Sequence, residues 1–153
     1  LGARLNRILH RDGIDNRFAT LFYAELRPAA GEVRWLNAGH NPPLVLRDGQ
    51  APRELGASAA PLGMLPGTAY AGDTVFLDPG DMLVVYSDGL TEATSPREEE
   101  FGLERLRRLA PRLRPLAPEA AGALILAEAD AFLAGERAHD DLSLIILRRE
   151  ASA

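Results

Sequence analysis

The chain has 153 residues, of which 46% are hydrophobic and 25% charged, and this balance predicts one globular domain with a core of its own. Its formal net charge of −5 argues against bulk binding to nucleic acid or to an anionic membrane surface. Cysteine is absent, which excludes a disulfide framework and thiolate metal sites and fits a reducing cytoplasm. No apolar run is long enough for a membrane-spanning helix, and no charged-then-apolar leader predicts a signal peptide.

The first half of the chain predicts one helix and then antiparallel strands. Apolar residues recur at helical spacing in residues 1–11, and the pattern is already under way at Leu1, so we expect a fragment of a longer protein. Three strands are predicted at 18–26, 33–39 and 43–47, with Gly and Pro in the turns between them. Residues 51–71 are rich in Ala, Pro and Gly and predict an irregular surface loop.

The second half predicts two more strands, two helices and a last strand. The strands are expected at Thr74–Leu77, Met82–Tyr86 and 140–149, and the helices at 96–113 and 117–135. The first helix is expected to carry acids in its first turn and a solvated arginine face, and the second to end at Gly135. This order predicts an α+β domain with mostly antiparallel sheet, and the hairpins argue against a doubly wound parallel fold.

Acidic residues stand at the ends of two predicted strands. Asp88 follows Val84–Tyr86, and Asp140 and Asp141 directly precede the apolar run 142–147. If these strands are antiparallel neighbours, their carboxylates share one rim of the sheet and need a cation or an arginine to offset their repulsion. Mg²⁺ and Mn²⁺ prefer such oxygen ligands, and Gly89 would let the backbone approach an ion. The alternative is that turn chemistry explains each piece separately: Asp-Gly is a common turn, and Asp-Asp before a strand can be a solvated cap.

The histidines leave further alternatives open. His40, within "NAGHNPP", could be a ligand, a general acid or a phosphate contact, or it could make a structural hydrogen bond at a hairpin end. His10 lies near a helix end, and His139 could orient the adjacent Asp140. A metallohydrolase built on His40 and His139 would need both imidazoles within metal reach of Asp88. No Gly-x-Ser-x-Gly, Gly-rich phosphate loop or His-Glu-x-x-His motif is present.

Several motifs occur in one order along nearly the whole chain, about residues 5 to 149. They are "RFATLFYAEL", "NAGHNPPLVLR", "PLG", "LDPGDMLVVYSDGLTEA", "EFGLERL" and "DDLSLIIL". This set resembles the metal-dependent type 2C-like (PPM) serine/threonine phosphatases, in the bacterial branch of sporulation and stress-response sigma-regulator phosphatases. The resemblance implies an α-β-β-α sandwich of mostly antiparallel sheets, here lacking the N-terminal strands. Residues 1–153 would then form a single domain, the C-terminal part of a PPM-type catalytic domain.

The resemblance also implies a site. Asp88 and Gly89 match the family's metal-binding Asp-Gly motif, and Asp140 matches the metal-binding Asp that opens the last strand. The resemblance implies that Asp88 and Asp140 are also the catalytic residues. Glu92 matches an acidic position that helps to hold a further metal in some relatives. His40 lies where eukaryotic-type relatives carry an aspartate. The family's earlier Asp, which bridges both metals, has no counterpart here, and Asp12 and Asp15 stand in the wrong context to replace it. The implied cofactors are two Mn²⁺ or Mg²⁺ ions in the intact site.

The implied activity is hydrolysis of phosphoserine or phosphothreonine in a protein, with two divalent ions activating a water and holding the phosphoryl oxygens. The implied substrate is a phosphorylated anti-sigma-factor antagonist in the cytoplasm, and upstream sensor domains and a homodimer are compatible with the resemblance. Without the bridging Asp, this segment is expected to bind ions weakly and to catalyse little. The alternative is a non-catalytic pseudophosphatase or a regulatory interaction module.

Overall fold

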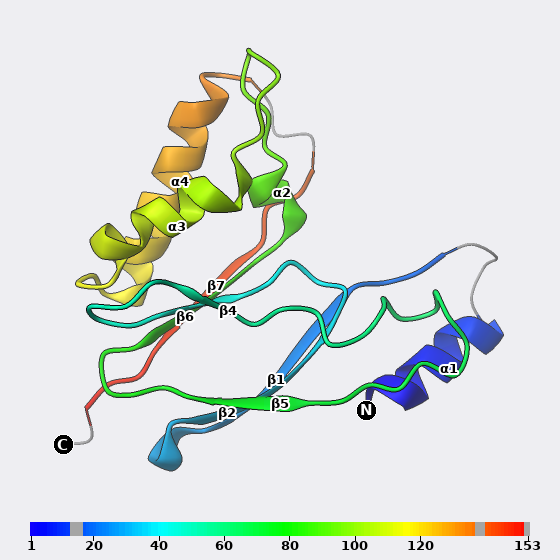
Figure 1. Ribbon diagram of the computed structural model, residues 1–153. Coiled ribbons are helices and arrows are strands. Elements are labelled where there is room, and N and C mark those ends of the chain that lie inside the picture. The colour runs from blue at the N-terminus through cyan, green and yellow to red at the C-terminus, as the bar shows by residue number, and fades with distance from the viewer. Residues whose placement is uncertain (13–16, 137–139, 152–153) are drawn as a thin grey trace. The chain divides into compact units, whose positions relative to one another are not determined.

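The computed structural model describes residues 1–12, 17–136 and 140–151 (Figure 1). The chain forms two compact units: the first comprises Leu1–Pro42 and Leu55–Leu77, and the second comprises Pro43–Glu54 and Asp78–Ala153. Across the described ranges, no helix combines the length and the apolar character that crossing a membrane would require.

The first unit is a helix and a three-stranded antiparallel sheet. Its elements are α1 (Gly2–Asp12), β1 (Leu21–Arg27), the short 3₁₀ helix η1 (Pro28–Ala30), β2 (Glu32–Ala38) and β5 (Asp73–Phe76). The strand order is β1-β2-β5. The predicted helix and the predicted β1–β2 hairpin are confirmed, with Leu21 opposite Ala38 and Arg27 opposite Glu32. In β2, Val33 and Trp35 are buried and Arg34 between them is exposed, as alternation along a strand requires, whereas the last four residues, 35–38, are all buried.

The second unit is a four-stranded sheet with three helices. Its strands are β3 (Leu44–Leu46), β4 (Arg53–Glu54), β6 (Met82–Tyr86) and β7 (Leu144–Arg148), and its helices are α2 (Asp88–Thr91), α3 (Gly102–Leu113) and α4 (Pro118–Leu133). The strands lie in the order β4-β3-β6-β7, and every pair is antiparallel. The core forms between this sheet and the helices, where Val84, Tyr86, Leu106 and Ile125 are almost fully buried. The predicted antiparallel α+β arrangement is confirmed.

A tight turn opens β6 and fixes where the strand begins. The amide of Asp81 donates to the carbonyl of Asp78 at 2.9 Å, and Gly80 between them has φ +92°, a value that Gly adopts without strain. The Asp81 carboxylate is buried, accepts from the amide of Asp78 at 2.9 Å and pairs at 3.0 Å with Arg47, the residue that follows β3. The turn therefore anchors the end of β6 that lies opposite Asp88.

Four local predictions need correction. The short helix α2 was expected to be a turn, and β4 was expected to be part of an irregular loop. The acids before α3 lie outside the helix, because it begins only at Gly102 and has Glu104 alone in its first turn. The arginines of this helix are mostly engaged: Arg107 pairs with Glu54 and Glu104, and Arg114 donates to the carbonyl of Arg47.

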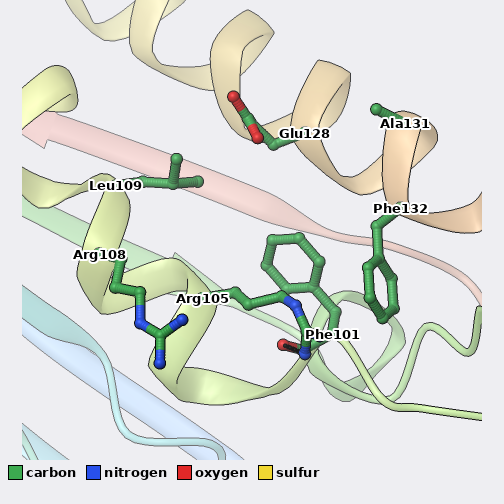
Figure 2. A pocket seen from close by; sticks show the side chains of 7 residues that line it. All are labelled: Phe101, Arg105, Arg108, Leu109, Glu128, Ala131 and Phe132. Atoms are coloured by element: carbon green, nitrogen blue, oxygen red, sulfur yellow. Dashed lines mark hydrogen bonds between the residues drawn. The ribbon is translucent and has the colours of Figure 1, made fainter.

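The helices α3 and α4 leave a groove between them, with a cavity volume of about 370 Å³ (Figure 2). Phe101 and Phe132 meet edge to face in it, with ring centroids 5.5 Å apart. The Arg105 guanidinium lies 4.3 Å from the centroid of the Phe132 ring, within the range of a cation–π contact. Figure 2 shows Arg105 extending from α3 toward these two rings, and Arg108 extending away from them.

Candidate active site

The ends of β6 and β7 bring the two acidic segments to one rim of the sheet (Figure 1). The strands pair antiparallel with Met82 opposite Arg148 and Tyr86 opposite Leu144. The last residue of β6 therefore faces the first residue of β7. Beyond this pair the ladder continues by one bond, from the amide of Ser87 to the carbonyl of Ser143 at 3.0 Å. The expectation that the two strands are antiparallel neighbours with their acidic ends on a common rim is confirmed.

The Ser87 hydroxyl ties the two segments together. Its Oγ accepts a hydrogen bond from the amide of Ser143 at 2.8 Å and donates one to the carbonyl of Asp141 at 3.1 Å. Together with the amide bond to Ser143, three hydrogen bonds join one residue of the β6 end to the segment before β7. The serine before Asp88 thus fixes the backbone that carries Asp141, the neighbour of Asp140.

Gly89 is required by a close backbone approach. A Cβ placed on Gly89 would lie 2.4 Å from the carbonyl oxygen of Asp141, 2.8 Å from its carbonyl carbon and 3.3 Å from the carbonyl oxygen of Asp140. All three atoms belong to the backbone, so they cannot be displaced as the end of a flexible side chain can. The first turn of α2 therefore lies directly against the Asp140–Asp141 segment.

The carboxylates of this rim are solvent-exposed and held by local bonds. The Asp88 Oδ1 accepts from the amide of Gly89 at 3.0 Å, and the Asp140 Oδ1 accepts from the amide of Asp141 at 2.7 Å. Asp88 is the first residue of α2, where the helix dipole favours a negative charge. The amide of Glu92 donates to the carbonyl of Asp88 at 2.8 Å and closes this short helix.

A cavity with a volume of about 250 Å³ opens at this rim. Its lining includes the predicted residues Gly89, Glu92 and Asp140, whereas Asp88 is not among the residues that line it. The other lining residues are Ala93, Thr94 and Glu100. Sequence reasoning missed Thr94 and Glu100, although the acidic run 98–100 shortly after "SDGLTEA" was a signal that could have pointed to this wall.

The donor chemistry of this rim fits a hard divalent cation. Asp88, Asp140 and Glu92 offer only carboxylate oxygens, and Gly89 leaves the room that a side chain would fill. Within residues 1–12, 17–136 and 140–151, no group of three or more His, Asp or Glu side chains is gathered closely enough to hold a metal.

The side chain of Tyr86 is buried at the end of β6, beneath the exposed carboxylates of the rim. Its side chain is 1% exposed, and burial raises the pKa of its phenol to about 12. A phenol with this pKa stays neutral at physiological pH, so Tyr86 adds packing rather than charge below the exposed carboxylates.

His10 and His40 both belong to the first unit. The backbone of His40 is held by Asn37, whose Oδ1 accepts from the His40 amide at 2.8 Å and whose amide group donates to the His40 carbonyl at 3.0 Å. The His40 ring stacks on Phe22 with centroids 6.5 Å apart, so a structural role within the first unit is present. The His10 Nδ1 lies 3.3 Å from the Gly63 carbonyl. His139 and Asp15 lie outside the described residues.

The sequence matches one protein family over nearly its whole length and is similar to several characterised proteins. The family described as Stage II sporulation protein E (SpoIIE) matches residues 1–150. Phosphoserine phosphatase RsbU of Bacillus subtilis is 31% identical, over 95% of this chain and 43% of its own length. Protein IcfG of Synechocystis is 38% identical over 58% of this chain and 14% of its own length. The chain thus spans less than half of either curated relative.

Solved structures share the fold. The PP2C phosphatase domain of SpoIIE from Bacillus subtilis, solved with a fragment of its regulatory domain, has a TM-score of 0.75 at 23% identity over 94% of this chain and 41% of that chain. The RsbU and RsbW domains of a Mycobacterium tuberculosis protein give a TM-score of 0.70 at 25% identity over 97% of this chain and 40% of that chain. The mixed helix and antiparallel sheet arrangement is therefore that of PP2C phosphatase domains.

Proposed function

Because the chain belongs to the Stage II sporulation protein E (SpoIIE) family, we propose that it forms part of a metal-dependent phosphoserine/phosphothreonine protein phosphatase. One structural observation carries the proposal: the pairing of β6 with β7 brings the segments of Asp88 and Asp140 to the same rim. The similarity to RsbU, which is named a phosphoserine phosphatase, supports the same reaction. We also propose that residues 1–153 belong to one catalytic domain.

In this proposal the rim residues hold Mn²⁺ or Mg²⁺. Asp88 and Asp140 would be the principal ligands, Glu92 would contribute from the cavity wall, and Gly89 would keep the backbone close to the site. When bound, such ions supply an activated water and neutralise the phosphoryl oxygens. The chain's own contribution is to fix the carboxylates on two paired strand ends, and the hydrogen bonds of Ser87 maintain that spacing.

We propose a phosphorylated anti-sigma-factor antagonist as the substrate. We also propose that the phosphatase acts on it in the cytoplasm. Sensor domains elsewhere in the polypeptide and a homodimer are further parts of this proposal. The length of RsbU supports the further domains, because RsbU is more than twice as long as the segment that matches this chain. The acidic character of the rim makes a cation necessary for binding a phosphate dianion, because carboxylates alone repel it.

The test is turnover by the full-length protein with Mn²⁺ and a phosphoserine protein substrate. Asp88→Asn should lower kcat/KM at least about 100-fold, because it removes the charge of a principal ligand. Asp130→Asn serves as the matched control, since Asp130 is an exposed acid on α4 that does not line the cavity of the rim. Unchanged turnover in Asp88→Asn would rule out the assignment.

The alternative of a non-catalytic regulatory module is decided by the same assay. A pseudophosphatase would show no Mn²⁺-dependent turnover in the wild-type protein, and Asp88→Asn and Asp130→Asn would then behave alike. Binding of the phosphorylated substrate without hydrolysis would favour this alternative over the phosphatase.

A further inference from the structure

The motif "EFGLERL" has no role in the candidate metal site. Its arginine, Arg105, makes hydrogen bonds to the segment that precedes α3. Arg105 stands on the first turn of α3 and reaches back toward the segment before the helix (Figure 2). Its Nη1 donates to the carbonyl of Glu100 at 2.7 Å and to the carbonyl of Phe101 at 3.1 Å, and its Nη2 donates to the carboxylate of Glu99 at 3.1 Å. One guanidinium therefore holds three consecutive residues.

The segment that Arg105 holds is a closed turn. Thr94 and Glu100 form an antiparallel bridge, the amide of Ser95 donates to the carbonyl of Glu99 at 2.9 Å, and the amide of Phe101 donates to the carbonyl of Ala93 at 2.8 Å. The side chains within the turn are largely exposed, so little apolar burial fixes its position. The hydrogen bonds of Arg105 to residues 99–101 are therefore a main contribution to the stability of this turn.

The two ends of this turn form a wall of the candidate active site. Thr94 and Glu100 line the same 250 Å³ cavity as Glu92 and Asp140. Any displacement of Glu100 changes the shape and charge of the cavity that a protein substrate must enter, while Asp88 and Asp140 stay on their own strand ends. The wall can therefore affect substrate binding separately from the reaction itself.

Arg105 is itself held in place from the other side. Its guanidinium lies 4.3 Å from the centroid of the Phe132 ring on α4, and Phe132 packs edge to face on Phe101. This arrangement suits the flat, delocalised guanidinium, which can stack on a ring while its nitrogens donate in the plane. A lysine would keep the charge but has a single nitrogen, so it would lose the fork by which Nη1 reaches the two carbonyls while Nη2 reaches the Glu99 carboxylate.

We propose that Arg105 is a positioning residue of the candidate site: it holds the wall of Thr94 and Glu100 and so sets the affinity for a phosphoprotein segment without touching the reacting atoms. The proposal rests on the proposed phosphatase function. It predicts a division between substrates, because a small phosphate ester needs only the metal rim whereas a peptide also contacts the wall.

The test compares Arg105→Lys with Arg108→Lys in the full-length protein. Arg108 is the matched control, since it lies on the same helix, lines the same α3–α4 groove and has no hydrogen-bond or ion-pair partner in the described part of the chain. With Mn²⁺, Arg105→Lys should raise KM for a phosphoserine peptide on the order of tenfold. It should leave kcat/KM for p-nitrophenyl phosphate within about twofold of the wild-type value, and Arg108→Lys should change neither substrate.

Hydrogen exchange of the amides of residues 94–101 supplies a readout that needs no activity. Arg105→Lys should speed this exchange and Arg108→Lys should not, because only Arg105 binds the turn. Equal losses on both substrates, or identical behaviour of the two variants, would overturn the proposal while leaving the phosphatase function standing. A wild-type protein inactive on both substrates would contradict the phosphatase function and the effect on affinity, and the exchange data would still decide whether Arg105 holds the wall.

Discussion

The contact between Gly89 and the Asp140–Asp141 segment predicts a large effect from adding one methyl group. In Gly89→Ala the new Cβ would lie 2.4 Å from the carbonyl oxygen of Asp141. Ordinary van der Waals contact begins about 1 Å farther out, so either α2 or the segment before β7 must move by about that amount. Both are backbone, and the hydrogen bonds of Ser87 hold them together.

The expected cost follows from this geometry. Overpacking of this kind lowers the free energy of unfolding by about 1–3 kcal/mol. For a chain of this size, that corresponds to a fall in Tm of roughly 2–12 °C. A shift of this size in the Asp140 segment should also weaken Mn²⁺ binding by about 10–100-fold, as changes beside metal ligands do.

Thermal unfolding and Mn²⁺ titration calorimetry on the same samples would check both values. Gly122→Ala is the matched control, because its Cβ would meet Ile146 and Leu144 of β7 at 3.7 and 3.8 Å, which are ordinary contacts. That substitution should be neutral or should stabilise α4 by up to about 1 kcal/mol. If Gly89→Ala unfolds at the wild-type temperature and binds Mn²⁺ equally well, the inferred close packing of the two acidic segments is refuted.

Two further predictions concern Ser87 and Tyr86, the two residues that precede Asp88. Ser87→Ala should lower the free energy of unfolding by about 1–2 kcal/mol, because the two hydrogen bonds of the Ser87 hydroxyl are lost. The control is Ser143→Ala, because Ser143 takes part in these bonds only through its backbone, and its free energy of unfolding should stay within about 0.5 kcal/mol of the wild-type value. Urea unfolding of both variants measures the two values. Tyr86 keeps its proton longer in the folded state, since burial raises its pKa from 10.0 to about 12. The free energy of unfolding should therefore fall as pH rises between these values, by at most about 3 kcal/mol. Tyr86→Phe should remove this part of the alkaline loss, and an unchanged pH profile in that variant would contradict the prediction.

The strand Met82–Tyr86 was predictable to the residue. It is a run of strongly apolar and β-branched residues, with Pro79–Gly80 before it and Ser87–Gly89 after it, so propensity, burial and turn chemistry agree. The sequence predicted a shared rim only on the condition that this strand and β7 are antiparallel neighbours, because one strand ends and the other begins with acidic residues. Pattern and site therefore pointed to the same place.

Features that depend on distant partners could not be predicted. The strand Arg53–Glu54 exists because it pairs with Val45 and Leu44, and its two residues carry no apolar alternation of their own. The acidic run before α3 looked like a first helical turn, yet Glu98 has φ +61° and the run folds into the turn that Arg105 holds. The periodicity of apolar residues does not reveal that a side chain in the first turn of a helix binds the backbone that precedes the helix.

The most direct test of the central claim is a Mn²⁺ binding cycle with Asp88→Asn, Asp140→Asn and the double variant, measured by titration calorimetry on the full-length protein. If one ion lies between the two carboxylates, each single change should weaken binding at least about tenfold, and the double variant should bind little worse than either single one. Additive losses in the double variant, or wild-type affinity in either single variant, would contradict a cation shared between the ends of β6 and β7.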